Sequence, residues 1–262
     1  MSGGTFTLSW LEYDILWEHL ELGRRPPVLD VNAHGRTVGE RDVLRAAAWK
    51  SMAGRGLGTP GAVEPDLRSC LRVLARPEWE VDGRLHLSAD GPRTSVLVGS
   101  SGTRGAVGVL DAGHLTVWLT AATGLARAMV ARLPAHPAGT GVSITLPAET
   151  LDACAARAGS DPDALRRALV SAGLGKDEAR KVVAVTSQVV RFGHIGAAHT
   201  PRHGERLRAD HVVSFYDNPR GRYLFTRRPS GDAVWVTLSP GGPSAVTRQV
   251  EELLDGLVRA RR

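Results

Sequence analysis

The clearest structural signal in the chain is in residues 79–120, which read WEVDGRLHLSADGPRTSVLVGSSGTRGAVGVLDAGHLTVWLT. Apolar and polar residues alternate through this segment, and Gly-containing turns interrupt the alternation. Because successive side chains of a strand point to opposite faces of a sheet, a period of two is typical of half-buried strands. Residues 79–120 therefore predict an antiparallel meander of four strands.

Helix signals flank the meander. Capping boxes, in which Ser or Thr is followed three residues later by Glu, predict helix starts at Ser9–Glu12 and Thr37–Glu40. Pro65 is at a favourable first-turn position for a third helix. The first of these helices is predicted at residues 9–22, and a further helix, Ala121–Leu133, is predicted to follow the meander.

The second half of the chain repeats this order. Its predicted elements are a strand at Val142–Leu146, helices near Ala148–Ala158, Pro162–Ala172 and Asp177–Thr186, strands near Gln188–His199, His211–Tyr216, Arg222–Thr226 and Ala233–Leu238, and a last helix at Ser244–Arg259. An offset of 117 residues places Gly56-Leu57 on Gly173-Leu174 and, without a gap in the strands, Trp118 on Trp235. Both tryptophans are expected to pack beneath the last helix of their own half. The alternative is that one of them is a partner-facing aromatic on the open face of the sheet. Tryptophans at non-equivalent positions would contradict the predicted repeat.

The expected fold class is α+β. We expect a single domain over residues 1–262, in which the N-terminal helix at 9–22 precedes two repeats of helices plus antiparallel sheet, at about 28–137 and 142–259. A pseudo-two-fold pairing of the repeats is the economical arrangement, because each meander has a free edge and one apolar face.

Composition excludes several classes of protein. With 262 residues, 42% of them hydrophobic, the chain is long and apolar enough to bury a core. The longest run without Asp, Glu, Lys or Arg is Leu133–Ala148, which contains three prolines and is too short to span a bilayer. The first basic residue is Arg24, so no charged segment resembling the start of a signal peptide is present. A cytoplasmic protein without membrane insertion is predicted.

The positive charge is concentrated in one part of the chain. The formal net charge is +6, and residues 161–262 contain 17 basic and 11 acidic side chains. Arginines and aromatic residues are mixed at Arg222-Tyr223-Leu224-Phe225 and Arg227-Arg228. Such a segment can bind a nucleic acid by stacking and charge, or it can form a half-exposed hairpin. An arginine-rich nucleic-acid-binding regulator is therefore one alternative; specific binding that persists at physiological salt would favour it.

Catalytic, metal-binding and cofactor-binding patterns are weak. Gly56-Leu57-Gly58-Thr59-Pro60-Gly61 matches G-x-G-x-x-G but follows a predicted helix, so a helix-ending loop is the better interpretation. His194, His199 and His203 lack a carboxylate at metal-site spacing. Cys70 and Cys154 are far apart and are interpreted as buried hydrophobes. No catalytic residue, metal or cofactor is predicted; an enzyme whose site the sequence hides is the remaining alternative.

Several segments together resemble the EspG family of type VII (ESX) secretion-associated chaperones of actinobacteria. The matching segments are Asp14-Ile15-Leu16-Trp17-Glu18, Pro27-Val28-Leu29, Glu40-Arg41, Arg55-Gly56-Leu57, Leu71–Pro77, Gly221-Arg222-Tyr223-Leu224 after Asp217, and Trp235-Val236-Thr237-Leu238-Ser239-Pro240. Each segment is short, but their order and spacing cover nearly the whole chain. The resemblance implies a fold of two α/β repeats about a pseudo-two-fold axis.

The resemblance also implies a non-catalytic function. EspG-like chaperones bind PE–PPE heterodimers in the cytosol, shield the apolar helical tip of the PPE protein and direct the pair to the secretion machine. They hold the partner with the central sheet and the C-terminal helical region, which here correspond to strands Gln188–His199 and His211–Thr226 and the helix from Ser244. The loop between Leu87 and Ser95, which contacts the partner in the family, is short here.

A groove for a helix needs an apolar floor and a polar rim. The candidate partner-binding residues lie in the basic part of the chain: Phe192, His194, Arg191, Arg206, Arg208 and Arg222. Strand alternation puts Phe192 and His194 on one face and Arg191 on the other. The Phe192 face is expected to be the partner side.

Overall fold

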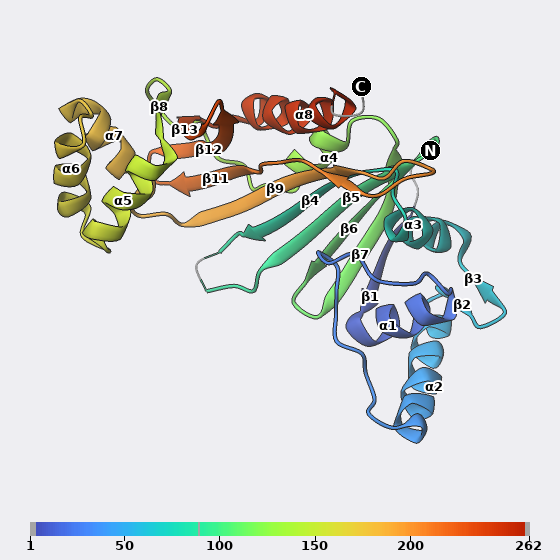
Figure 1. The fold of residues 1–262 in the computed structure, drawn as a ribbon. Helices are drawn as coiled ribbons and strands as arrows, with labels where there is room; N and C mark the ends of the chain where they lie inside the picture. Colours follow the sequence, from blue (N-terminus) through green and yellow to red (C-terminus); the bar gives the residue numbers. More distant parts are fainter. Residues whose placement is uncertain (1–3, 89, 260–262) are drawn as a thin grey trace. The chain divides into compact units, whose positions relative to one another are not determined.

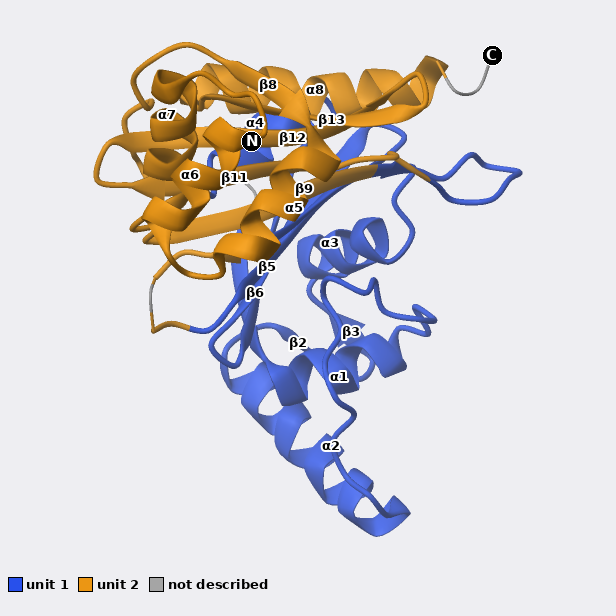
Figure 2. Cartoon of the chain, turned by 60° about the vertical axis from the view of Figure 1, so that its left-hand side comes forward, with its two compact units in different colours: residues 1–84, 92–132, 198–207 blue, residues 85–91, 133–197, 208–262 orange. Residues whose placement is uncertain are grey.

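The structure is a computed structural model that describes residues 4–88 and 90–259 (Figure 1). The chain divides into two compact units (Figure 2). Unit 1 consists of residues 1–84, 92–132 and 198–207, and unit 2 of residues 85–91, 133–197 and 208–262. Each unit has its own strands, helices and apolar core.

The meander predicted from residues 79–120 is confirmed in unit 1. Its strands are β4 (Trp79–His86), β5 (Thr94–Ser101), β6 (Arg104–Asp111) and β7 (His114–Ala121). An edge strand that the sequence did not predict, β1 (Thr5–Ser9), pairs antiparallel with β7. The order across this sheet is β4-β5-β6-β7-β1.

Unit 1 contains α1 (Trp10–His19), α2 (Val38–Gly54), α3 (Pro65–Ala75) and α4 (Leu125–Val130), and a small hairpin of β2 (Gly58–Thr59) and β3 (Ala62–Val63). Both predicted capping boxes are present, and α1 begins at Trp10 as expected. It ends at His19 because Glu21 adopts a positive φ of 52°. The helix predicted at Ala121–Leu133 is wrong in length, since Gly124 adopts a left-handed conformation directly before α4.

Unit 2 contains β8 (Ile144–Pro147), α5 (Ala148–Ala158), α6 (Pro162–Ser171), α7 (Lys176–Thr186), β9 (Arg191–His199), the short β10 (Leu207–Arg208), β11 (Val213–Asn218), β12 (Gly221–Ser230), β13 (Ala233–Pro240) and α8 (Pro243–Arg259). The order across its sheet is β9-β11-β12-β13-β8. All the elements predicted for the second half are present with small shifts of their ends.

The order of elements is the same in the two units. Apart from β2, β3 and β10, each has one strand, three helices, four meander strands and a last helix. The first strand pairs with the last meander strand in both cases. In this order β1 and α1 stand at the start of the first set of elements. The division of the chain into an N-terminal helix at 9–22 and two repeats stays a prediction. The pseudo-two-fold axis and the single domain stay predictions.

The same cap ends α2 and α6. Gly56 and Gly173 have φ values of 69° and 99°. Each glycine N–H donates to the carbonyl three residues earlier, and each following leucine N–H to the carbonyl five residues earlier, at 2.9–3.1 Å. Only glycine adopts this backbone without strain. Gly56-Leu57 and Gly173-Leu174 therefore have the same place at the ends of α2 and α6. Gly56 ends a helix as interpreted, but Gly58–Thr59 form β2 instead of loop.

Trp118 and Trp235 are not equivalent, so the prediction of a gap-free repeat at an offset of 117 residues is wrong by the criterion stated for it. At the turns before them, Asp111 pairs with His114 and Ser230 with Ala233, an offset of 119 residues instead of 117. The reason is that β12 has 10 residues where β6 has 8. The side chain of Trp235 is also 38% exposed, so it is not packed beneath α8 as expected.

Helices cover both faces of the sheet in unit 2. Arg227 on β12 reaches Asp152 on α5, whereas the next residue, Arg228, reaches Glu252 on α8. Because neighbouring residues of a strand point to opposite faces, α5 and α8 lie on opposite faces. The α5 side has a core formed by residues of β8, α5, α6, α7, β12 and β13: Ile144, Leu146, Leu151, Cys154, Leu169, Val182, Tyr223, Val236 and Leu238.

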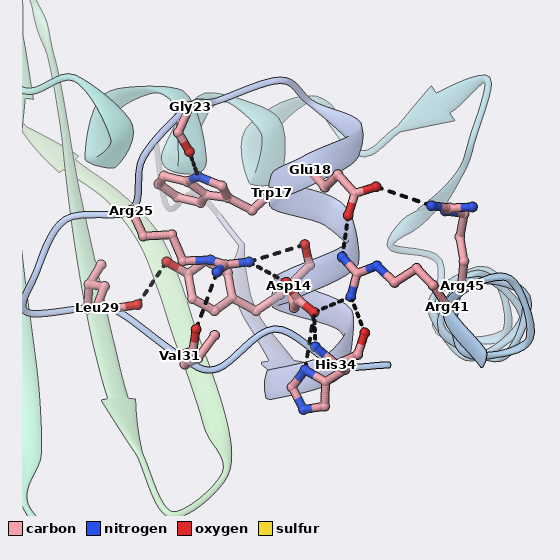
Figure 3. Close-up of polar contacts among 11 residues, drawn as sticks. Asp14, Trp17, Glu18, Gly23, Arg25, Leu29, Val31, His34, Arg41 and Arg45 are labelled. Carbon is pink, nitrogen blue, oxygen red and sulfur yellow. Dashed lines mark hydrogen bonds and ion pairs between the residues drawn. The ribbon is translucent and has the colours of Figure 1, made fainter. Parts of the chain in front are cut away.

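A buried carboxylate organises the start of unit 1 (Figure 3). Asp14 on α1 accepts hydrogen bonds from the guanidinium groups of Arg25 and Arg41 and from the backbone N–H of His34 (2.8 Å). Nearby, Trp17 Nε1 donates to the Gly23 carbonyl (2.8 Å). These bonds tie the segment that follows α1 to the helix. Burial raises the pKa of Asp14, but the bonds from Arg41, His34 and Arg25 outweigh it and lower the pKa to about 2.

The lowered pKa of Asp14 predicts that the free energy of unfolding falls in acid. The pKa of Asp14 is about 2 in the folded protein against 3.8 for an ordinary aspartate. Its contribution of about 2 kcal/mol is therefore complete above pH 4 and is lost as the pH falls through 2. We expect urea unfolding at pH 5 and pH 2.5 to differ by less in Asp14→Asn than in the wild-type protein. If the two proteins lose the same free energy of unfolding between pH 5 and pH 2.5, the lowered pKa of Asp14 is contradicted.

Candidate partner-binding surface

One face of the sheet in unit 2 has a row of aromatic side chains. Phe192 on β9 lies opposite Tyr216 on β11, and Phe225 lies on the adjacent strand β12. The ring centroids of Phe192 and Tyr216 are 6.5 Å apart, and those of Tyr216 and Phe225 are 6.0 Å apart. We call the face of the unit 2 sheet with these three side chains the aromatic face. It is the face that α5 partly covers, as the strand alternation from Phe225 to Arg227 shows.

The aromatic face has a hollow of about 540 Å³. The hollow is lined by residues of β9, β11, β12 and β13 and of the segment before β11: His194, Asp210, His211, Val212, Ser214, Tyr216, Phe225, Arg227, Pro229 and Val234. Val212 and Val234 are exposed, whereas Ser214 at the strand centre is buried. An exposed apolar hollow of this kind is typical of a binding surface.

His194 lies beside the hollow in its neutral form. Its Nδ1 is 2.8 Å from the hydroxyl of Ser214, directly opposite on β11. Burial and the neighbouring His86 lower the pKa of His194. The ring of His86 also stacks on Phe192, with centroids 4.4 Å apart. The aromatic face is therefore uncharged along β9 near neutral pH.

The structure places the predicted residues in three different settings. Phe192, 36% exposed, and His194 share the aromatic face, and Arg191 points to the other face, where it lies 3.7 Å from the carboxylate of Asp217. Arg206 belongs to unit 1 and donates to Glu80 through Nε (2.9 Å). Arg208 lies in β10 with an exposed side chain.

Arg222 is a correction, because it is 1% exposed and cannot lie on a partner surface. It makes a bidentate ion pair with Asp217, with distances of 2.7 and 2.8 Å, and donates a third bond to the Pro134 carbonyl (2.9 Å). Its backbone N–H and carbonyl bind Pro137 and Gly139. Arg222 therefore holds the segment before β8 against β12.

Sequence reasoning missed the most informative residues of the aromatic face. Tyr216, Ser214 and Val234 were inside predicted strands but were not proposed as contacts, and Phe225 was noted only as part of a hairpin. Alternation within one strand shows which residues share its face, but not which residues of the neighbouring strand lie opposite. The pairing of β9 with β11 supplies that information.

Metal-ion clusters and membrane-spanning helices are not found in the part of the chain that the structure describes. Within residues 4–88 and 90–259, no three His, Cys, Asp or Glu side chains are grouped so that they could hold a metal ion. The helices described there are all too short or too polar to span a membrane. Cys70 and Cys154 are free and buried, which confirms their interpretation as buried hydrophobes.

The fold and the aromatic face define a mixed α/β protein built from repeated helix-and-meander units that has a surface suited to binding another protein. The model of the EspG family matches residues 9–252, and the chain belongs to this family. No curated protein matches the sequence.

Among solved structures, the chain is similar to EspG5, a type VII secretion system chaperone of Mycobacterium tuberculosis that was solved in complex with a PE25–PPE41 dimer. The TM-score is 0.76 over 96% of each chain, at 15% sequence identity. At this identity the similarity establishes the fold, and the expected α+β class is confirmed.

Proposed function

We propose that the protein is a cytosolic chaperone of a type VII secretion system. It binds a PE–PPE-like helical heterodimer, shields the apolar tip of that partner and directs it to the secretion machine, without catalysis. Membership of the EspG family carries this proposal. The fold it shares with EspG5, whose structure contains a PE25–PPE41 dimer, supports it.

The aromatic face supports the same function. An apolar helical tip aggregates when exposed, so its chaperone must offer an apolar surface that covers it. The row of Phe192, Tyr216 and Phe225 beside the hollow provides such a surface. We assign Phe192 and His194 to the partner side.

Copurification tests the function. The tagged protein is purified from its native host, and bound proteins are identified by mass spectrometry. A PE–PPE-like pair that also forms a stable complex with the purified chain in gel filtration is the expected result. Recovery of nucleic acid in stoichiometric amount, with no such pair, would contradict the proposal.

Phe192→Ala tests the surface. Because Phe192 is only partly buried, the variant is expected to lose about 1 kcal/mol of stability or less, against about 3–5 kcal/mol for a core phenylalanine. Partner affinity should fall by about tenfold or more, as for an interface anchor. The measurements are thermal melting and calorimetric titration.

Trp235→Ala is the matched control. Trp235 is exposed to a similar extent, but strand alternation puts it on the opposite face of the sheet from the hollow. It should leave affinity unchanged. A large loss of stability in Phe192→Ala with unchanged affinity per folded molecule would show that Phe192 belongs to the core.

A further inference from the structure

The two units differ at equivalent positions of their sheets. Ser101 pairs with Arg104 at the β5–β6 turn, and Asn218 pairs with Gly221 at the β11–β12 turn, so this hairpin keeps the offset of 117 residues. The offset places three positions of unit 1 on the aromatic face of unit 2: Gly99 on Tyr216, Gly108 on Phe225 and Leu97 on Ser214.

In unit 1, helix α3 covers the glycine positions. A Cβ atom added to Gly108 would lie 2.9 Å from Leu74 of α3, and one added to Gly99 would lie 2.9 Å from Pro77, directly after the helix. Real Cβ atoms do not approach neighbours so closely, so glycine is what allows the helix to pack against β5 and β6. Leu67, Leu71 and Leu74 are fully buried in that interface.

In unit 2, the same positions stay partly open. Tyr216 and Phe225 are half-buried, and the hollow of about 540 Å³ lies above Ser214. Where unit 1 fills the equivalent position with the buried side chain of Leu97, unit 2 has a serine. Large aromatics therefore surround a small residue on a face that α5 covers only in part and that is hollowed beside it.

We propose that an amphipathic helix of the secreted partner occupies on unit 2 the place that α3 occupies on unit 1, with one large apolar side chain in the hollow above Ser214. This inference rests on the proposed chaperone function. The aromatic spacings of 6.5 and 6.0 Å match the rise of about 6 Å between residues i and i+4 of a helix that crosses the strands.

The charges around the hollow indicate which kind of side chain the partner helix places against it. Arg227 is paired with Asp152, with distances of 2.5 and 2.9 Å, and His211 with Asp210 at 2.6 Å. Because Arg227 is already paired within unit 2 and Asp210 is hydrogen-bonded to His211, the buried face of the partner helix complements the hollow by being apolar and uncharged.

Ser214→Leu is the direct test, because it places in unit 2 the side chain that unit 1 has at the equivalent position. The probe is the PE–PPE-like pair that copurifies with the wild-type protein, and affinity is measured by calorimetric titration. We expect Ser214→Leu to bind at least about 100-fold more weakly, since the leucine occupies the hollow. Ser214→Ala leaves the hollow open and should bind within about threefold of wild type.

A second pair of variants shows whether a loss of binding is caused by the changed surface or by misfolding of the protein. Val234 lines the hollow and Val43 lies on α2, outside the segments expected to hold the partner; both valines are exposed. Val234→Asp should weaken binding at least about tenfold, and Val43→Asp should not, while both keep the wild-type melting temperature within a few degrees. If the wild-type protein binds but Ser214→Leu and Val234→Asp bind equally well, the helix position is wrong and the chaperone function stands. If the wild-type protein binds no such pair, the function itself is wrong.

Discussion

Replacing Arg222 by leucine is expected to lower the free energy of unfolding by about 3–5 kcal/mol, the usual cost of removing one partner of a buried ion pair. The carboxylate of Asp217, 0% exposed, would lose both hydrogen bonds from the guanidinium. Among residues 4–88 and 90–259, the ion pair that would remain is the one with Arg191, at 3.7 Å. Urea unfolding followed by circular dichroism measures the change.

Two further variants separate the buried pair from a general effect. Arg220→Leu changes an exposed arginine in the turn before Arg222 and should change stability by less than about 0.5 kcal/mol. Asp217→Leu combined with Arg222→Leu removes both charges and should cost less than Arg222→Leu alone. A stable Arg222→Leu protein with lost partner binding would instead restore Arg222 to the partner surface.

The second large effect is expected for Asp14→Asn, with a loss of about 3 kcal/mol. Asp14 is buried and joins Arg25, Arg41 and the backbone of His34, and the asparagine keeps the shape of the side chain but removes its charge. The loss lies at the lower end for buried pairs because both arginines reach the solvent in part.

Glu18→Gln is the matched control for Asp14. Glu18 lies one turn further along α1 and also binds Arg41, but its side chain is 53% exposed. Exposed ion pairs contribute about 0–1 kcal/mol, so this variant should be nearly as stable as wild type. Equal losses in the two variants at pH 7 would show that burial of Asp14 is not what makes its contacts strong.

Both predictions concern segments on which the family resemblance depends. Asp14 is part of the Asp14–Glu18 segment and Arg222 of the Gly221–Leu224 segment. In the structure each joins chain segments within its own unit, the first through Arg25 and His34 and the second through Pro134 and Pro137. These two motifs therefore stabilise the fold, whereas the aromatic face is the surface proposed to bind the partner.

Local signals explain why most elements could be predicted. The capping boxes at Ser9 and Thr37 satisfy backbone N–H groups at the start of a helix with side chains three residues away. The alternation in residues 79–120 depends only on neighbouring side chains. By contrast, β1 alternates polar and apolar residues over only five positions directly before a helix, and its pairing with β7, more than 100 residues later, is what makes it a strand.

The candidate site could be predicted only in part for the same reason. Alternation along β9 correctly put Phe192 and His194 on one face and Arg191 on the other. The register of β9, β11 and β12 places three more residues on the face of Phe192 and His194: Tyr216, Ser214 and Phe225. This register depends on contacts across the sheet, which alternation along one strand does not show.

Neighbouring residues along the chain encode the helices, the meanders, the repeated order of elements and the resemblance to EspG proteins, so the order of amino acids is enough to predict these features. Tertiary structure alone decided that Arg222 is buried against Asp217 while the neighbouring Arg220 is exposed. It also decided that glycines on β5 and β6 of unit 1 correspond to aromatic residues around an open hollow on β11 and β12 of unit 2. The physical reason is that burial depends on which distant segments pack against a residue. An arginine has the same local pattern whether its charge meets water or a buried carboxylate.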